Sequence, residues 1–305
     1  MNAPLLAAAA TGVQVGAAIV ASRYVVGEVP PLTLALLRYA IGLACLLPFV
    51  RGAWRRAALP TPVPRRDLAA MAALGIGQFA VLIALMNYGL QTVGAARAAL
   101  IFSLVPLLTL LLGAALGRER FKPLLGAGVL LSIGGVALDL VPHLAAQAGQ
   151  PLPWLGVLAV LGSALTGAVC SVLYRPYLRR YPTLPVSALA MGASVLFLAV
   201  LALTEAWPQR VGALSPLAWW VIVFIGLSSG VGYLLWLYAL KHESPTRVTV
   251  FLALNPVTAA VLGWALLGER VDGWGWAALA CIALGLWMSS RPSPKNAIKK
   301  QADRA

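Results

Sequence analysis

Ten long apolar segments constrain this chain more than any other feature of its sequence. Each has about 20 residues, the length of a helix that crosses the hydrocarbon core of a bilayer. They cover residues 4–26, 31–50, 67–90, 94–116, 123–141, 153–174, 184–204, 216–240, 246–267 and 274–290. Apolar residues run continuously through each segment and do not alternate with polar ones, which excludes the strands of a membrane barrel. The sequence therefore predicts an all-α membrane protein with ten transmembrane helices and no soluble domain.

The basic residues test this helix count. Lys and Arg number 23 against nine Asp and Glu, which gives a net charge of +14. If the N-terminus is cytoplasmic, 18 of the basic residues fall on the cytoplasmic side and four on the outer side. Such an excess is typical of cytoplasmic loops. We therefore expect both termini in the cytoplasm of a bacterium, with the chain in its inner (plasma) membrane. A nucleic-acid partner is not expected, because the charges alternate from loop to loop and do not form one face.

The two halves of the chain repeat each other without a gap at an offset of 150 residues. Leu matches are common by chance in so apolar a sequence, but matches of rarer residues are not. The informative pairs are Tyr88 and Tyr238, Arg97 and Arg247, Pro106 and Pro256, Gly113 and Gly263, and Glu119-Arg120 and Glu269-Arg270. Five helices per half is an odd number, so the second half must be inserted upside down. An inverted repeat of this kind is a signature of transporters.

Motifs in both halves resemble the EamA-type repeat. They are Ser103 to Pro106 with Gly113 and Gly117 to Arg120, and Leu254 to Pro256 with Gly263 and Leu267 to Arg270. Arg38 fits the second helix of that repeat, and Gly232 to Leu240 fit the eighth helix. The resemblance covers nearly the whole chain and implies the ten-helix branch of the drug/metabolite transporter superfamily, similar to aromatic and broad amino-acid exporters. It implies repeats at residues 1–142 and 143–290, followed by a cytoplasmic polar tail at 291–305.

Polar side chains inside the apolar segments are candidates to line a substrate cavity, because an amide in lipid should point inward. Several recur at helical spacing. The candidates are Gln14, Gln78, Ser229 and Asn255 as polar contacts, with Tyr233 and Trp236 as aromatic walls. Such a lining suits a zwitterion with a variable apolar side chain. Hydrogen bonding between helices is the alternative explanation for about half of them.

Three arginines are candidates for gating or for contact with an anion. Arg38 lies about seven residues into the second segment, roughly 10 Å deep at 1.5 Å per residue. It either contacts a carboxylate or ties helix ends together through backbone carbonyls. Arg97 and Arg247 begin the fourth and ninth segments and could attract anions there, aided by a helix N-terminus. Anchoring at the membrane interface is the alternative role for these two.

Pro106 and Pro256 lie within the fourth and ninth segments. A proline inside a helix removes one backbone hydrogen bond, which here frees the carbonyls of Phe102 and Leu252. We expect both prolines to kink their helices around a central cavity, although a packing role is also possible.

No catalytic constellation is present, so an enzyme is not expected. The histidines, His143 and His242, are about 100 residues apart, and no paired acids, nucleophile motif or phosphate loop occurs. No cofactor or metal is expected. Asp139 is the one acid well inside a segment and either titrates or caps the end of its helix. The sequence favours an exporter of amino acids or similar metabolites. Drug efflux on the same fold is the alternative, and a membrane-embedded lipid enzyme fits less well. The oligomeric state stays open, with a monomer plausible.

Overall fold

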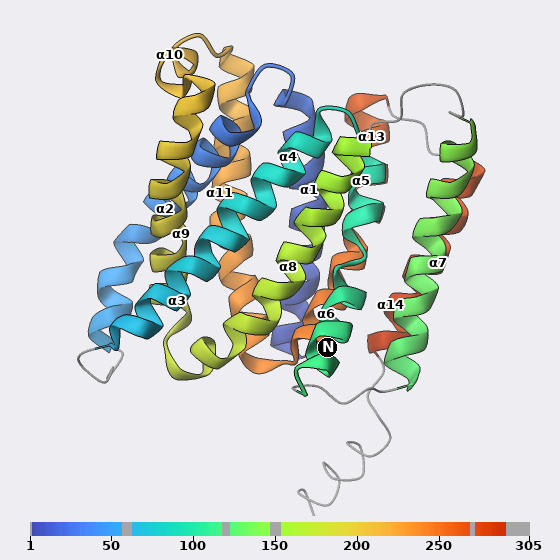
Figure 1. The fold of residues 1–305 in the computed structure, drawn as a ribbon, viewed down its shortest axis with the longest axis horizontal. Coiled ribbons are helices and arrows are strands. Elements are labelled where there is room, and N and C mark those ends of the chain that lie inside the picture. Colours follow the sequence, from blue (N-terminus) through green and yellow to red (C-terminus); the bar gives the residue numbers. More distant parts are fainter. Residues whose placement is uncertain (1, 57–62, 118–122, 147–153, 269–271, 291–305) are drawn as a thin grey trace, which may run out of the picture.

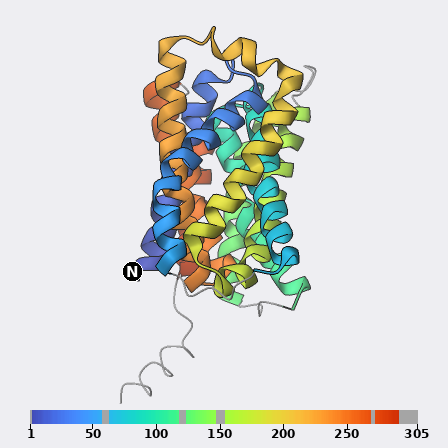
Figure 2. The same cartoon turned by 90° about the vertical axis from the view of Figure 1, so that its left-hand side faces the viewer.

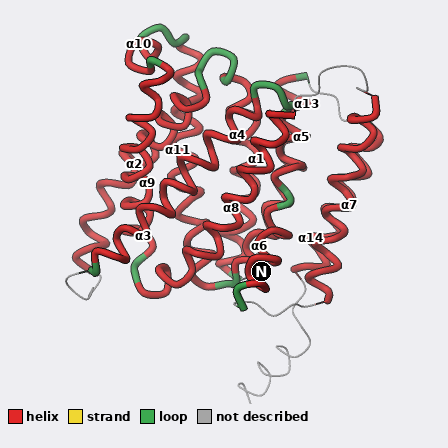
Figure 3. Tube along the Cα trace, in the orientation of Figure 1, coloured by secondary structure: helices red, strands yellow, loops and turns green. Residues whose placement is uncertain are grey.

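The computed structural model describes residues 2–56, 63–117, 123–146, 154–268 and 272–290, which form a bundle of helices (Figure 1). Within these ranges there is no strand (Figure 3). In the part of the chain that the structure describes, eight spans are long and apolar enough to cross a membrane. Four of them contain a single long α-helix: α1 (Ala3–Val25), α2 (Pro31–Arg56), α8 (Trp154–Arg180) and α11 (Pro216–His242). A fifth consists of α9 (Thr183–Leu201) and the 3-10 turn η2 (Ala202–Glu205), which the short helix α10 (Trp207–Val211) follows.

The other three spans are interrupted within their length. The third span has a π-helical turn, η1 (Ile76–Val81), between α3 (Arg65–Gly75) and α4 (Leu82–Leu90). The fourth breaks between α5 (Ala95–Phe102) and α6 (Val105–Ala115). The ninth predicted segment contains α12 (Pro245–Thr249), the 3-10 turn η3 (Val250–Ala253) and α13 (Leu254–Leu267).

The fifth and tenth predicted segments also form helices, α7 (Pro123–Ala146) and α14 (Gly273–Ser290). Their apolar parts in the described residues, Gly126–Gly135 and Gly273–Gly285, are shorter than a full span. All ten apolar segments are thus helical, and eight of them meet the length and composition of a membrane span. Asp139, the matching pairs Glu119-Arg120 and Glu269-Arg270, and the tail at 291–305 lie outside the residues or side chains that the structure describes.

Both predicted kinks differ from the expectation of a bend in the middle of a helix. Pro106 lies in the first turn of α6, after the break at Ser103–Leu104, and Pro256 is the third residue of α13, after η3. A proline has no N–H to donate and so fits the first turn of a helix, and each helix restarts one or two residues before its proline. The sequence located these irregularities within a few residues but not their form.

Helix pairings across the bundle recur with the two halves exchanged. In the first half α1 packs against α11 and α13, and its counterpart α8 packs against α4 and α6. Helix α2 packs against its counterpart α9, and the two lie side by side in Figure 2. In Figure 1, α1 begins at the bottom of the bundle and α8 begins at the top, so these two counterparts run in opposite directions.

Helices α7 and α14 pair with each other at one edge of the bundle (Figure 1). Their contact is reciprocal at the same 150-residue offset. Gly135 packs on the carbonyl of Ala278, and Gly285 packs on the carbonyl of Gly128, so closely that a Cβ at either glycine would overlap the carbonyl oxygen. Small residues allow such close backbone approach between helices in lipid.

Two further glycines end equivalent helices. Gly117 follows α6 with φ of 62°, and Gly268 follows α13 with φ of 68°. The left-handed region strains residues with a side chain, and it is the usual conformation of a glycine that stops a helix. Both halves of the chain therefore stop this helix in the same way.

Candidate substrate site

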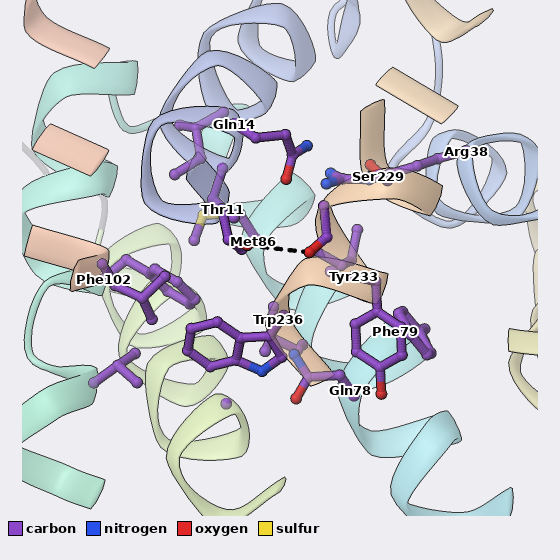
Figure 4. A pocket seen from close by; sticks show the side chains of 18 of the residues that line it. Thr11, Gln14, Arg38, Gln78, Phe79, Met86, Phe102, Ser229, Tyr233 and Trp236 are labelled. Atoms are coloured by element: carbon purple, nitrogen blue, oxygen red, sulfur yellow. Dashed lines mark hydrogen bonds between the residues drawn. The ribbon is translucent and has the colours of Figure 1, made fainter. Parts of the chain in front are cut away.

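A cavity lies where helices of the two halves meet (Figure 4). The first half contributes residues from α1, α2, η1, α4, α5 and α6, and the second half contributes residues from α8, α11 and η3. The space between the lining atoms amounts to about 770 Å³, including the part that is open to the outside.

Polar groups gather around Arg38 on one side of the cavity. The Arg38 side chain is 7% exposed, and its Nε donates to Ser229 Oγ at 2.7 Å. Ser229 Oγ in turn donates to the carbonyl of Ile225, one turn earlier in α11. Gln14 Nε2 donates to Ser228 Oγ at 3.2 Å. Gln14 and Arg38 therefore both reach the cavity from the first half and bond to serines of α11.

A chain of aromatic rings closes another wall. The Tyr39 and Phe79 rings have centroids 4.6 Å apart, and Phe79 and Tyr233 have centroids 4.2 Å apart, both edge to face. Edge-to-face packing is a favourable arrangement of aromatic side chains. The π-helical turn η1 carries both Phe79 and Gln78, and such turns occur frequently at functional sites. The Gln78 Oε1 atom is buried without a hydrogen-bond partner.

The remaining wall is apolar. Met86, Phe102 and Trp236 surround the part of the cavity away from Arg38 (Figure 4). Leu252 of η3 also lines it. The cavity thus combines polar groups with apolar and aromatic walls, and among the described residues that line it Arg38 is the only one with a charged side chain.

Five of the six predicted substrate contacts line this cavity: Gln14, Gln78, Ser229, Tyr233 and Trp236. The sixth, Asn255, does not. It is fully buried where α13 packs on α1, and its carbonyl oxygen would lie 2.7 Å from a Cβ at Gly16. Neither polar atom of the Asn255 side chain has a hydrogen-bond partner.

The three predicted arginines separate in the same way. Arg38 lines the cavity, whereas Arg97 and Arg247 do not. Arg247 forms an ion pair with Glu243 at 2.6 Å, four residues earlier. Arg97 is half-buried in α5, and its Nε is buried without a partner. The structure thus joins only Arg38 to the predicted polar contacts.

Several lining residues were missed in the sequence. Phe79, Leu82, Ile83 and Met86 line the cavity from one helical face at intervals of three and four residues. These residues follow Gln78 on the same helix, so the inward direction of the Gln78 amide could have identified the helical face that lines the cavity. Phe102 and Leu252 were singled out only for their carbonyls, yet both line the cavity beside the interrupted helices.

A family model, described as the EamA-like transporter family, matches residues 2–140 and again residues 154–291. The chain belongs to the EamA-like transporter family. The double match coincides with the two halves defined by the 150-residue repeat. This family of membrane transporters gives no support to an enzymatic role.

Curated relatives of this EamA-like chain are named as transporters. An uncharacterized transporter of Archaeoglobus fulgidus is 27% identical over 90% of this chain and 94% of its own length. A probable terminal-alkyne amino-acid exporter of Streptantibioticus cattleyicolor is 31% identical over 67% of each chain. The uncharacterized inner membrane transporter YedA of Escherichia coli K12 is 27% identical over 84% of this chain and 80% of its own.

A solved crystal structure has the same fold. It matches with a TM-score of 0.66 at 23% sequence identity, and the match covers 92% of this chain and 96% of the other. At this identity the likeness concerns the fold alone.

Proposed function

We propose that this protein exports amino acids or similar small metabolites by alternating access. The single observation that carries the proposal is the cavity between the halves, with its polar side at Arg38 and its apolar and aromatic walls. A zwitterion loses its hydration on entry, and neutral dipoles such as Gln14 and Gln78 replace that hydration without trapping the substrate. One relative of the chain is named as an amino-acid exporter, which agrees with this substrate class.

The proposed transporter has ten transmembrane helices in two inverted five-helix repeats, residues 1–142 and 143–290. Three observations support this arrangement: the ungapped repeat, the recurrent helix pairings, and the opposite directions of α1 and α8. An inverted repeat provides two equivalent packings of the same parts, one open to each side of the membrane. The loop charges favour cytoplasmic termini, and the relative YedA is named as an inner membrane protein.

In alternating access one end of the bundle opens while the other stays closed, so the contacts between the halves at each end would break in turn. At the end where α1 meets α2, Glu28 accepts from the backbone N and Oγ of Ser215 at 2.6 and 2.9 Å. Glu205 accepts there from the backbone N and Oγ1 of Thr33 at 2.7 and 2.8 Å. Each carboxylate thus joins one half to the other.

At the opposite end, where α3 begins, Asp67 performs the same task. Its Oδ2 accepts from Arg180 Nη1 at 2.9 Å and from Tyr181 OH at 2.6 Å. Opening this end requires separation of Asp67 from both partners, while the Glu28 and Glu205 contacts hold the other end closed.

Transport in proteoliposomes tests the proposal. Vesicles with the purified protein should accumulate labelled apolar amino acids faster than empty vesicles, and Trp236→Ala should slow this flux. The matched control is Trp264→Ala, because Trp264 is 67% exposed whereas Trp236 is 5% exposed in the cavity wall. Absence of flux for a full amino-acid panel would refute the proposed function. Unchanged flux in both Trp236→Ala and Gln78→Ala would refute this lining.

A further inference from the structure

We propose that Arg38 binds the carboxylate of the substrate, and that the site recognises carboxylates whether or not they carry an amino group. This inference rests on the proposed function and specifies its substrate class. Arg38 is the only charged side chain among the described residues that line the cavity, so no acidic residue is among them. A bound carboxylate would therefore be the counter-charge that the folded chain does not supply.

The hydrogen bond of Arg38 to Ser229 uses Nε and leaves the two terminal nitrogens of the guanidinium for a ligand. The Arg38 Nε atom is occupied by Ser229 Oγ at 2.7 Å, and Ser229 is itself bonded to the carbonyl of Ile225. Within the described residues, neither terminal nitrogen of Arg38 has a carboxylate partner. A guanidinium binds a carboxylate through two parallel hydrogen bonds, and its two terminal nitrogens form one edge suited to that contact.

Ser229 consequently acts as a positioning residue and not as a substrate contact. Its hydroxyl accepts from Arg38 and donates to Ile225, so its own hydrogen is not available to a ligand. The bond holds the guanidinium plane in place, with the Tyr39 ring centroid 5.4 Å from its central carbon. Figure 4 shows Arg38 extending into the cavity beside Ser229, on the side where Gln14 also points.

Burial makes an anion favourable here. Arg38 is 7% exposed and belongs to a span of apolar helix, where an unpaired charge is unfavourable. A carboxylate neutralises it in surroundings that screen the attraction weakly. An ammonium group finds only neutral acceptors in the lining, such as Gln78 Oε1, and it is repelled by Arg38. Recognition is therefore unequal, with the carboxylate required and the amino group dispensable.

Competition with labelled phenylalanine flux in proteoliposomes tests this inequality on the wild-type protein. Three analogues keep the ring and change the charged groups: N-acetylphenylalanine is an anion, and phenylalaninamide and phenethylamine are cations. We expect the anion to compete about as well as phenylalanine itself, and both cations to compete about 10-fold or more weakly, because charge-assisted hydrogen bonds are lost. Equal competition by the amide would overturn the proposal.

Substitution of Arg38 adds an independent readout. Arg38→Gln should lower the apparent affinity for both carboxylates by about 10- to 100-fold and remove their advantage over the cations. Arg38→Lys should keep part of that advantage, since lysine keeps the positive charge but lacks the two parallel donors of a guanidinium. Arg210→Gln, an exposed arginine outside the cavity, is the matched control and should change neither value. Unchanged discrimination in a folded Arg38→Gln protein would also overturn the proposal.

Ligand-dependent thermal stability separates this inference from the proposed function. If N-acetylphenylalanine raises the melting temperature of the detergent-solubilised protein while no amino acid is transported, amino-acid export fails and carboxylate recognition stands. If amino acids are transported without discrimination between anion and cation, export stands and carboxylate recognition fails.

Discussion

The substitution Gly226→Ala should disturb the site although Gly226 itself does not line the cavity. Gly226 lies on α11 where this helix packs against α2. A Cβ at this position would lie 2.7 Å from Ile41 Cβ and 3.0 Å from the carbonyl oxygen of Arg38. Carbon atoms in favourable contact are about 3.5–4.0 Å apart. The two helices must therefore separate by roughly 1 Å to admit one methyl group.

That separation acts directly on the bond between Arg38 and Ser229, because these residues belong to the same two helices. Their 2.7 Å contact would lengthen to about 3.7 Å, beyond hydrogen-bond range. A net hydrogen bond contributes about 0.5–1.5 kcal/mol, which corresponds to roughly a 2- to 12-fold loss of apparent affinity for a carboxylate. Overpacking should also lower the free energy of unfolding by about 1–3 kcal/mol.

Flux against substrate concentration, together with melting temperature, measures both effects. Gly27→Ala is the matched control, because nothing lies within 4 Å of a Cβ at Gly27, and both quantities should stay at their wild-type values. Combination of Gly226→Ala with Arg38→Gln should reduce affinity little beyond Arg38→Gln alone, since both act through one contact. Wild-type affinity in Gly226→Ala would refute this reasoning.

Three other changes have defined outcomes. Pro256→Ala should slow transport more than it lowers folded yield, and an equal loss of both would indicate a packing role for this proline. Gly268→Ala should lower the melting temperature through about 1 kcal/mol of backbone strain at φ of 68°, and an unchanged melting temperature would contradict a left-handed stop at this residue. The Asp67 carboxylate raises the pKa of Tyr181 by accepting its hydrogen bond, so in Asp67→Asn an ultraviolet titration should show one tyrosine ionising at lower pH than in the wild type.

The composition of the cavity also predicts whether export is coupled to protons. No acid is among the described residues that line it, so amino-acid flux should not depend on a pH gradient. Proteoliposomes with and without such a gradient measure this. A gradient-dependent flux that Asp139→Asn abolishes would contradict uncoupled export.

Helix positions in this fold follow from quantities that a sequence displays directly. The length of each apolar run located every long helix within about five residues, except that α2 and α8 each continue six residues further, to Arg56 and Arg180. The π-helical turn at Ile76–Val81 could not be predicted, because no proline marks it and it depends on packing against neighbouring helices. The prolines marked the other breaks, but a proline does not specify whether a helix bends or restarts.

The lining of the candidate cavity could be predicted where the polarity of a side chain was informative. Gln14 and Gln78 point into the cavity because amides avoid lipid. Asn255 also avoids lipid, yet it lies in a contact between helices and not in the cavity. Both environments keep a polar side chain away from lipid, so polarity does not distinguish them. Apolar walls such as Met86 and Phe102 stayed hidden, because an apolar residue in a membrane helix faces lipid, protein or cavity equally well.

The reciprocal contact of α7 and α14 has a mechanical consequence. Exchange of the two halves turns the contact of Gly135 with Ala278 into that of Gly285 with Gly128, so this interface maps onto itself. An interface of that kind lies on the axis that relates the halves. Residues on the axis stay in place when the two halves exchange conformations, so α7 and α14 would not move during alternating access. A covalent link between α7 and α14 would then leave transport unchanged, whereas a link across either end of the bundle would stop transport.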